Sequence, residues 1–163
     1  MMLGRLEEAA AQLQKQAEIE PGAESEYRSG AVLAILTKKY DQADSLIAKA
    51  ERINPRFMIA WLKASLFAAR GEKEKALALS KGSEVDFLGM VYALLGMKDE
   101  TIESLKRYGD EHEKEGLYLY LLHFPLFADL RDDPRFMALV EKEKKKYEEY
   151  LRRYGDLGVL GEE

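Results

Sequence analysis

The 163-residue sequence contains no cysteine, so the chain can form no disulfide, thiolate nucleophile or cysteine metal site. It also lacks a sustained alternation of β-branched and polar residues, which is the pattern of a half-buried strand. Its longest apolar run, near residues 116–127, is too short to span a bilayer, and no basic, apolar leader follows Met1. We therefore expect no β-sheet and no membrane insertion of this stretch of chain. A cytoplasmic location is expected, with a membrane-anchored parent protein as the alternative.

What the sequence does contain is Ala, Leu and charge of both signs. Hydrophobic residues make up 47% of the chain and charged residues 34%, which favours an all-α protein. The length suits one domain with a sizeable core. The net charge of -5 disfavours nucleic acid as the main partner, because phosphate binding needs a concentrated positive surface.

The stretch 27–55 has the pattern of a helical hairpin. Its first half places one aromatic and several small residues on one helical face: Tyr27, Gly30, Ala31 and Ala34. Its second half has a matching face: Tyr40, Ala43, Ile47 and Ala50. Pro55 then ends the second helix. Because small residues allow close approach, the two helices are expected to pack as an antiparallel pair.

The same pattern recurs about 34 residues away in both directions. Forward, the first face becomes Trp61, Ala64, Ser65 and Ala68. Backward, the proline and the second face become Pro21, Leu13, Ala9 and Leu6. These residues resemble the tetratricopeptide repeat (TPR) family. The resemblance implies stacked hairpins that form a right-handed superhelix.

The repeat becomes irregular after the second hairpin. Leu88, Gly89, Tyr92 and Gly96 match the first helix of a third unit. However, Gly71 and Gly96 are only 25 residues apart, so the helix between them must stop before Lys81. We expect helices over 24–36 and 41–52, over 56–70 and 72–80, and over about 99–113.

Beyond the repeat lies an apolar segment, 117–130, that Pro125 interrupts, so a short or broken helix is expected there. Asp133 before Pro134 is typical of an N-cap and a first turn, and predicts a helix that ends at about Tyr154. The apolar stripe of this helix is Phe136, Val140, Tyr147, Leu151 and Tyr154. An amphipathic helix of this kind is expected to cap the stack.

We expect one TPR-like domain over 1–154, with a repeat core at about 6–113, a C-terminal cap at about 117–154 and a flexible tail at 155–163. The segment 127–140 also resembles one that often ends TPR regions in larger bacterial proteins, including regulators and kinases. The chain is therefore expected to be the C-terminal TPR region of such a protein.

No set of residues in the sequence converges on a reaction. Residues 110–113, Asp-Glu-His-Glu, are consecutive, so on a helix they point in different directions and cannot bind one metal ion. His123 lies among apolar and aromatic residues, where a buried histidine bonded to the backbone is expected. The tail glycines have the wrong spacing for a dinucleotide loop. We expect no catalytic residue, metal or cofactor, and no enzyme activity.

The expected function is that of a protein-interaction scaffold. In the TPR family the first helices of successive hairpins line a groove, and the matching positions here are Arg28, Val32, Ile35, Ile59, Leu62, Lys63, Leu66, Asp86, Phe87 and Met90. With only two basic residues, this set disfavours a clamp for a peptide carboxylate. An exposed apolar groove is unfavourable in water, so either the C-terminal helices cover it or a partner helix, peptide or subunit lies in it.

Two other functions stay open. Residues 3–18 have the pattern of a second helix without its first, which suggests either an excised regulatory segment of a larger enzyme or transcription regulator, or a capping helix. Residues 142–154 combine lysines with tyrosines that could stack on nucleotides. Glutamates between positions 141 and 149 reduce the positive field, which disfavours a nucleic-acid binder.

Overall fold

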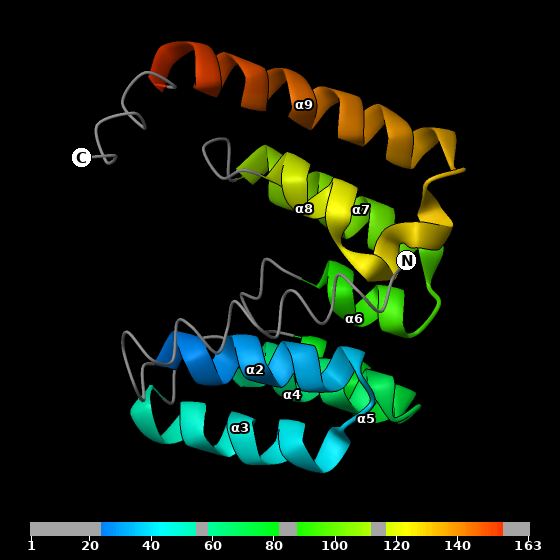
Figure 1. Cartoon of the computed structure of the whole chain (residues 1–163). Coiled ribbons are helices and arrows are strands. Elements are labelled where there is room, and N and C mark those ends of the chain that lie inside the picture. Colours follow the sequence, from blue (N-terminus) through cyan, green and yellow to red (C-terminus); the bar gives the residue numbers. More distant parts are fainter. Residues whose placement is uncertain (1–23, 55–58, 82–87, 112–116, 155–163) are drawn as a thin grey trace, which may run out of the picture.

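The computed structural model describes residues 24–54, 59–81, 88–111 and 117–154, and within these ranges all regular structure is helical (Figure 1). The elements are α2 (Glu24–Leu36), α3 (Tyr40–Ile53), α4 (Ile59–Ala69), α5 (Lys73–Ser80), α6 (Gly89–Leu94), α7 (Lys98–Glu111), α8 (Leu117–His123), the 3-10 helix η1 (Pro125–Leu130) and α9 (Pro134–Tyr154). The all-α prediction is confirmed for this part of the chain. The predicted helix at 3–18 and the tail at 155–163 lie outside it.

Helices that follow one another pack as hairpins: α2 with α3, α4 with α5, and α6 with α7. Figure 1 shows α2 to α5 at one end of the molecule, α6 in the middle, and α7, α8 and α9 on the other side. The hairpins join through α4, because α3, α2 and α6 all contact it. Between α3 and α4, Tyr40 Oη donates to the Ala69 carbonyl at 3.0 Å. The expected stack of helical hairpins is confirmed.

The three hairpin turns share one backbone conformation. Each places a residue in the left-handed region just after the first helix: Lys38 (φ 60°), Gly71 (φ 79°) and Gly96 (φ 70°). The amide of the next residue then donates to a carbonyl five positions back, as Lys39 N does to Ala34 O at 2.8 Å. This is the Schellman arrangement, which satisfies the last carbonyls of a helix. The turns therefore repeat although their spacing changes from 33 residues to 25.

The core of each hairpin depends on small side chains at fixed places after the turn. Ala43, Ala76 and Thr101 each lie five residues beyond the left-handed residue, and each is fully buried. In the third hairpin a Cβ on Gly89 would lie 2.8 Å from Leu105 Cδ2, so only glycine allows this approach of α6 to α7. The small faces seen in the sequence are thus the contacts between paired helices.

The shortened second helix of the second hairpin is also confirmed. α5 ends at Ser80, before Lys81, as the 25-residue spacing required. Pro125 separates α8 from η1, and Phe124 before it adopts extended backbone. The segment 117–130 is therefore the broken helix that the sequence predicts.

Two hydrophobic clusters lie side by side. The first is built from α2 to α6, and the second from α6 to α9 and η1. Phe124 and Leu126 pack against both clusters. The C-terminal elements therefore lie directly against the hairpin stack, in the position of a cap.

Candidate functional site

The structure places most of the predicted groove residues in the core. Five are at most 5% exposed: Ile35, Ile59, Leu62, Leu66 and Met90. Val32 is half-buried against the same cluster. A side chain buried this deeply cannot touch a partner while the stack stays folded. These positions therefore do not line an open groove, which corrects that expectation.

The reason is the position of α4. It packs against α2, α3, α5 and α6, so that an apolar residue on almost any of its faces is covered. Leu126 of η1 adds further cover, because it packs against the same cluster. Of the two occupants that the sequence left open, the burial favours the chain itself.

Of the polar residues predicted to line the groove, one forms an ion pair and another is partly buried. Lys63 Nζ lies 2.7 Å from Glu51 Oε1 of α3, and Arg28 is half-buried. Asp86 and Phe87 lie outside the described residues. Binding of a partner to any of these residues stays a prediction.

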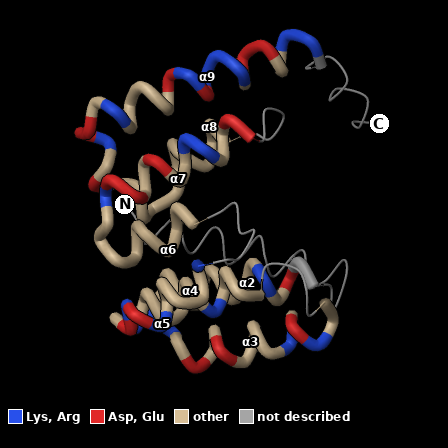
Figure 2. Tube along the Cα trace, turned by 180° about the vertical axis from the view of Figure 1, so that it is seen from behind, with Lys and Arg blue, Asp and Glu red and all other residues tan. Residues whose placement is uncertain are grey.

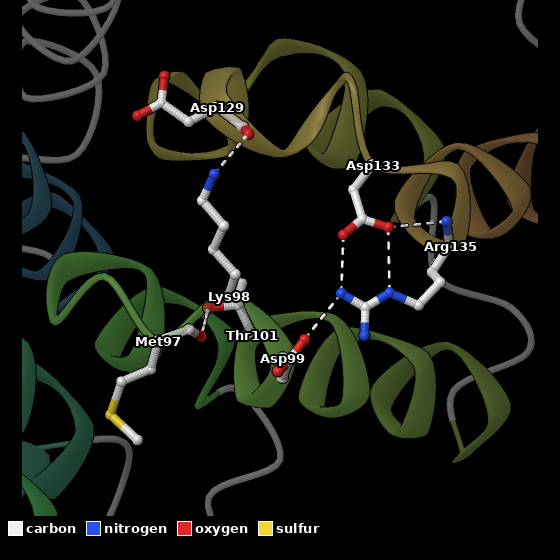
Figure 3. Close-up of polar contacts among 7 residues, drawn as sticks. All are labelled: Met97, Lys98, Asp99, Thr101, Asp129, Asp133 and Arg135. Atoms are coloured by element: carbon white, nitrogen blue, oxygen red, sulfur yellow. Dashed lines mark hydrogen bonds and ion pairs between the residues drawn. The ribbon is translucent and has the colours of Figure 1, made fainter.

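The cap is joined to the third hairpin by a polar contact at the start of α9 (Figure 3). The guanidinium of Arg135 binds both carboxylate oxygens of Asp133, at 3.1 and 2.7 Å, and lies 2.7 Å from Asp99 Oδ1 of α7. The backbone amide of Arg135 donates to Asp133 Oδ1 at 2.9 Å, which confirms Asp133 as the predicted N-cap. These hydrogen bonds lower the pKa of Asp133 to about 2. In Figure 3, Lys98 also reaches the Asp129 carbonyl.

A second contact between α7 and α9 contains a buried carboxylate that sequence analysis missed. Glu143 is 3% exposed, and its Oε1 lies 2.8 Å from Lys146 Nζ but receives no hydrogen bond from the described residues. Lys146 Nζ donates to the Gly109 carbonyl at 2.7 Å. The sequence does indicate that Glu143 faces inward, since it lies between Val140 and Tyr147 on the inner stripe of α9. Only the approach of Gly109 makes room for it: a Cβ there would lie 3.0 Å from Glu143 Oε1.

The apolar stripe of α9 continues beyond the helices that it covers. Phe136 and Val140 are buried, and the ring of Tyr147 packs on Tyr118 with 5.5 Å between centroids. Further along, Tyr150 is 53% exposed and Leu151 46%. Figure 1 shows why, because the C-terminal end of α9 extends past the N-terminal end of α8. The stripe is therefore buried in the first part of the helix and exposed at Leu151.

Charge along α9 is mixed, and most of its basic side chains have acidic neighbours (Figure 2). Lys142 binds Asp110 of α7, and hydrogen bonding to Lys142 lowers the pKa of that aspartate. Lys144 lies 3.8 Å from Glu148, and Arg153 lies 2.6 Å from Glu149. The surface of α9 therefore lacks the concentrated positive field that phosphate binding needs.

The remaining candidates for chemistry are not assembled into a site. His123 is exposed at the end of α8, which corrects the expectation of a buried histidine. It lies on the outer side of that helix, opposite the buried Leu117 and Leu121. His112 and Glu113 are outside the described residues. Within the described ranges, no group of three or more His, Asp or Glu side chains could hold a metal ion.

No helix in the described part of the chain is long and apolar enough to cross a membrane. A scan against protein-family models and searches of curated proteins and of solved structures find no match to the chain.

Proposed function

We propose that this protein is a non-catalytic protein-interaction scaffold whose binding surface is the exposed end of α9. The single observation that carries the proposal is the exposure of Tyr150 and Leu151, at 53% and 46%, on a stripe that is buried elsewhere in the same helix. An apolar helix face rimmed by charged residues is a common docking surface for a partner helix. The TPR resemblance of the hairpins supports the same class of function.

The proposal differs from a groove between the first helices. Those residues are buried, whereas both flanks of the α9 stripe are exposed, from Glu148 and Glu149 to Arg152 and Arg153. A partner can therefore bind α9 without opening the hairpin stack. The hairpin stack then holds α9 in place, and the exposed end of α9 is the surface that binds the partner.

The proposal is tested with Leu151→Glu, which places a charge on the exposed stripe. Proteins from cells that make this chain are retained on the immobilised parent, on Leu151→Glu and on Ser45→Glu, a control at an exposed position of α3. We expect Leu151→Glu alone to lose specific binding while its melting temperature stays that of the parent. Equal retention by all three chains would contradict the proposal.

A further inference from the structure

One side of α2 is apolar and faces away from the rest of its hairpin. The described helices with the main contacts to α2 are α3 and α4. Leu33 and Leu36 lie on the side away from both, since helical spacing turns them away from the fully buried Ala31. Both side chains are half-buried, whereas Leu151, on an uncovered helix face, is 46% exposed. This side of α2 is therefore a surface that takes a partner.

α4, the first helix of the next hairpin, shows what kind of partner such a helix takes. Tyr40, at the start of α3, donates from its hydroxyl to the carbonyl of Ala69 at the end of α4. Glu51, in the last turn of α3, binds Lys63 in the first half of α4. α3 thus lies antiparallel to α4, and the second helix of one hairpin packs on the first helix of the next.

Residues 3–18 stand before α2 as α3 stands before α4. Their sequence predicts a helix in which small or apolar residues recur four, three and four positions apart on one stripe. These residues are Leu6, Ala10, Leu13 and Ala17. The stripe carries no charged residue, so it can pack on Leu33 and Leu36 without burying a charge.

The connection to α2 also matches the connection between the hairpins. Pro21 precedes Tyr27 of α2 by six residues, and Pro55 precedes Trp61 of α4 by six. A short connection places two helices beside each other in antiparallel directions. It also holds residues 3–18 near α2 at an effective concentration of about millimolar, which favours this segment over a partner from solution.

We propose that residues 3–18 form a helix that packs antiparallel on the Leu33 and Leu36 side of α2, as α3 packs on α4. The start of this helix, at Leu6, lies beside the end of α2. Its end, at Ala17, lies beside the first half of α2. The inference goes beyond the proposed function, because α2 and the exposed end of α9 lie at opposite ends of the molecule (Figure 1).

The absence of cysteine allows a direct test by cross-linking within one chain. Two double variants place thiols where the helices should meet: Leu6→Cys with Leu36→Cys, and Ala17→Cys with Ser29→Cys. The control is Leu6→Cys with Ser29→Cys, because residues 29 and 36 are about 10 Å apart along α2. A short thiol cross-linker should join the first two pairs within one chain, and the control far more slowly.

Two results of this experiment would overturn the inference. Equal rates for the control and the matched pairs would show that residues 3–18 take no fixed direction along α2. Products with the mass of two chains would show that a second copy supplies the helix. Mass spectrometry of the cross-linked protein distinguishes both results from the expected one.

A substitution on the stripe gives a second, independent measurement. Leu13→Glu places a charge against α2 and should lower the melting temperature by about 4 °C or more. It should also abolish the cross-link between residues 6 and 36. Gln12→Glu adds the same charge but points away from the stripe, so it should melt like the parent. Equal melting of the two variants, with the cross-link retained in both, would contradict the packing of this stripe on α2.

Discussion

Lys38 and Gly71 occupy the same position in consecutive hairpin turns, and both adopt the left-handed backbone conformation, with φ of 60° and 79°. Glycine takes this conformation without a steric penalty, whereas a residue with a Cβ is strained there. The turn of the first hairpin is therefore made by a residue that does not favour it.

Replacing Lys38 with glycine should stabilise the protein. Relief of the left-handed strain exceeds the entropy cost of an added glycine, and we expect the free energy of unfolding to rise by about 0.5–1 kcal/mol. Urea denaturation measures the change. The control is Lys39→Gly, because the φ of Lys39 is -88° and no strain is relieved there. Equal effects at the two positions would show that the strain argument is wrong.

Two glycines on the hairpin faces should respond differently to alanine. At Gly89 a Cβ would lie 2.8 Å from Leu105 Cδ2 and 2.9 Å from its Cγ, so Gly89→Ala should overpack the core and cost about 1–3 kcal/mol. A Cβ added at Gly30 would lie 3.3 Å from its nearest atom, Leu46 Cδ1. The flexible Leu46 side chain can shift to relieve this close contact. Gly30→Ala should therefore be near neutral or stabilising, since alanine favours helix. Thermal denaturation of both variants tests this difference.

The N-cap of α9 predicts an effect of pH. Because hydrogen bonds from Arg135 lower the pKa of Asp133 from 3.8 to about 2, the unfolded chain binds more protons at acidic pH. The contribution of this carboxylate is complete above the unfolded pKa and is lost as pH falls from about 4 to about 2. Asp133→Asn should therefore be less stable than the parent at neutral pH.

The difference in urea midpoint between the parent and Asp133→Asn should narrow as the solution is acidified. Asp132→Asn, an exposed neighbour outside the cap, serves as the control. A difference that persists unchanged below about pH 2 would contradict the assignment of Asp133 as an ionised cap.

Leu62→Glu tests whether the first helices form a core or a groove. Leu62 is fully buried in α4, so a glutamate there would be a buried charge without a partner. We expect a loss of several kcal/mol, and a melting transition far below that of the parent. Normal melting with loss of partner binding would instead restore the groove interpretation.

Much of the fold could be predicted because local rules agree with the packing. Small residues at helical spacing located the hairpin faces, Asp133 before Pro134 located the start of α9, and the distance from Gly71 to Gly96 located the end of α5. Each of these features is specified by residues close in the sequence. The tertiary contacts then follow the same pattern.

The surface could be predicted less well, because exposure depends on which helices lie alongside. The periodicity of α9 is the same at Val140 and Leu151, yet one is buried and the other exposed. The reason is that α8 begins at Leu117, close to Tyr147, and does not extend alongside Leu151 (Figure 1). The prediction of a groove was wrong for the converse reason, because its residues are covered by neighbouring helices. Their pattern does not reveal that α4 has neighbours on several sides.

The proposed function requires that the end of α9 contacts another protein molecule. A photo-cross-linking amino acid at position 150, compared with one at the exposed position 45 of α3, measures this contact directly in the cells that make the chain. The account predicts a discrete cross-linked product at position 150 and none at position 45. No product at position 150, or the same products at both positions, would contradict it.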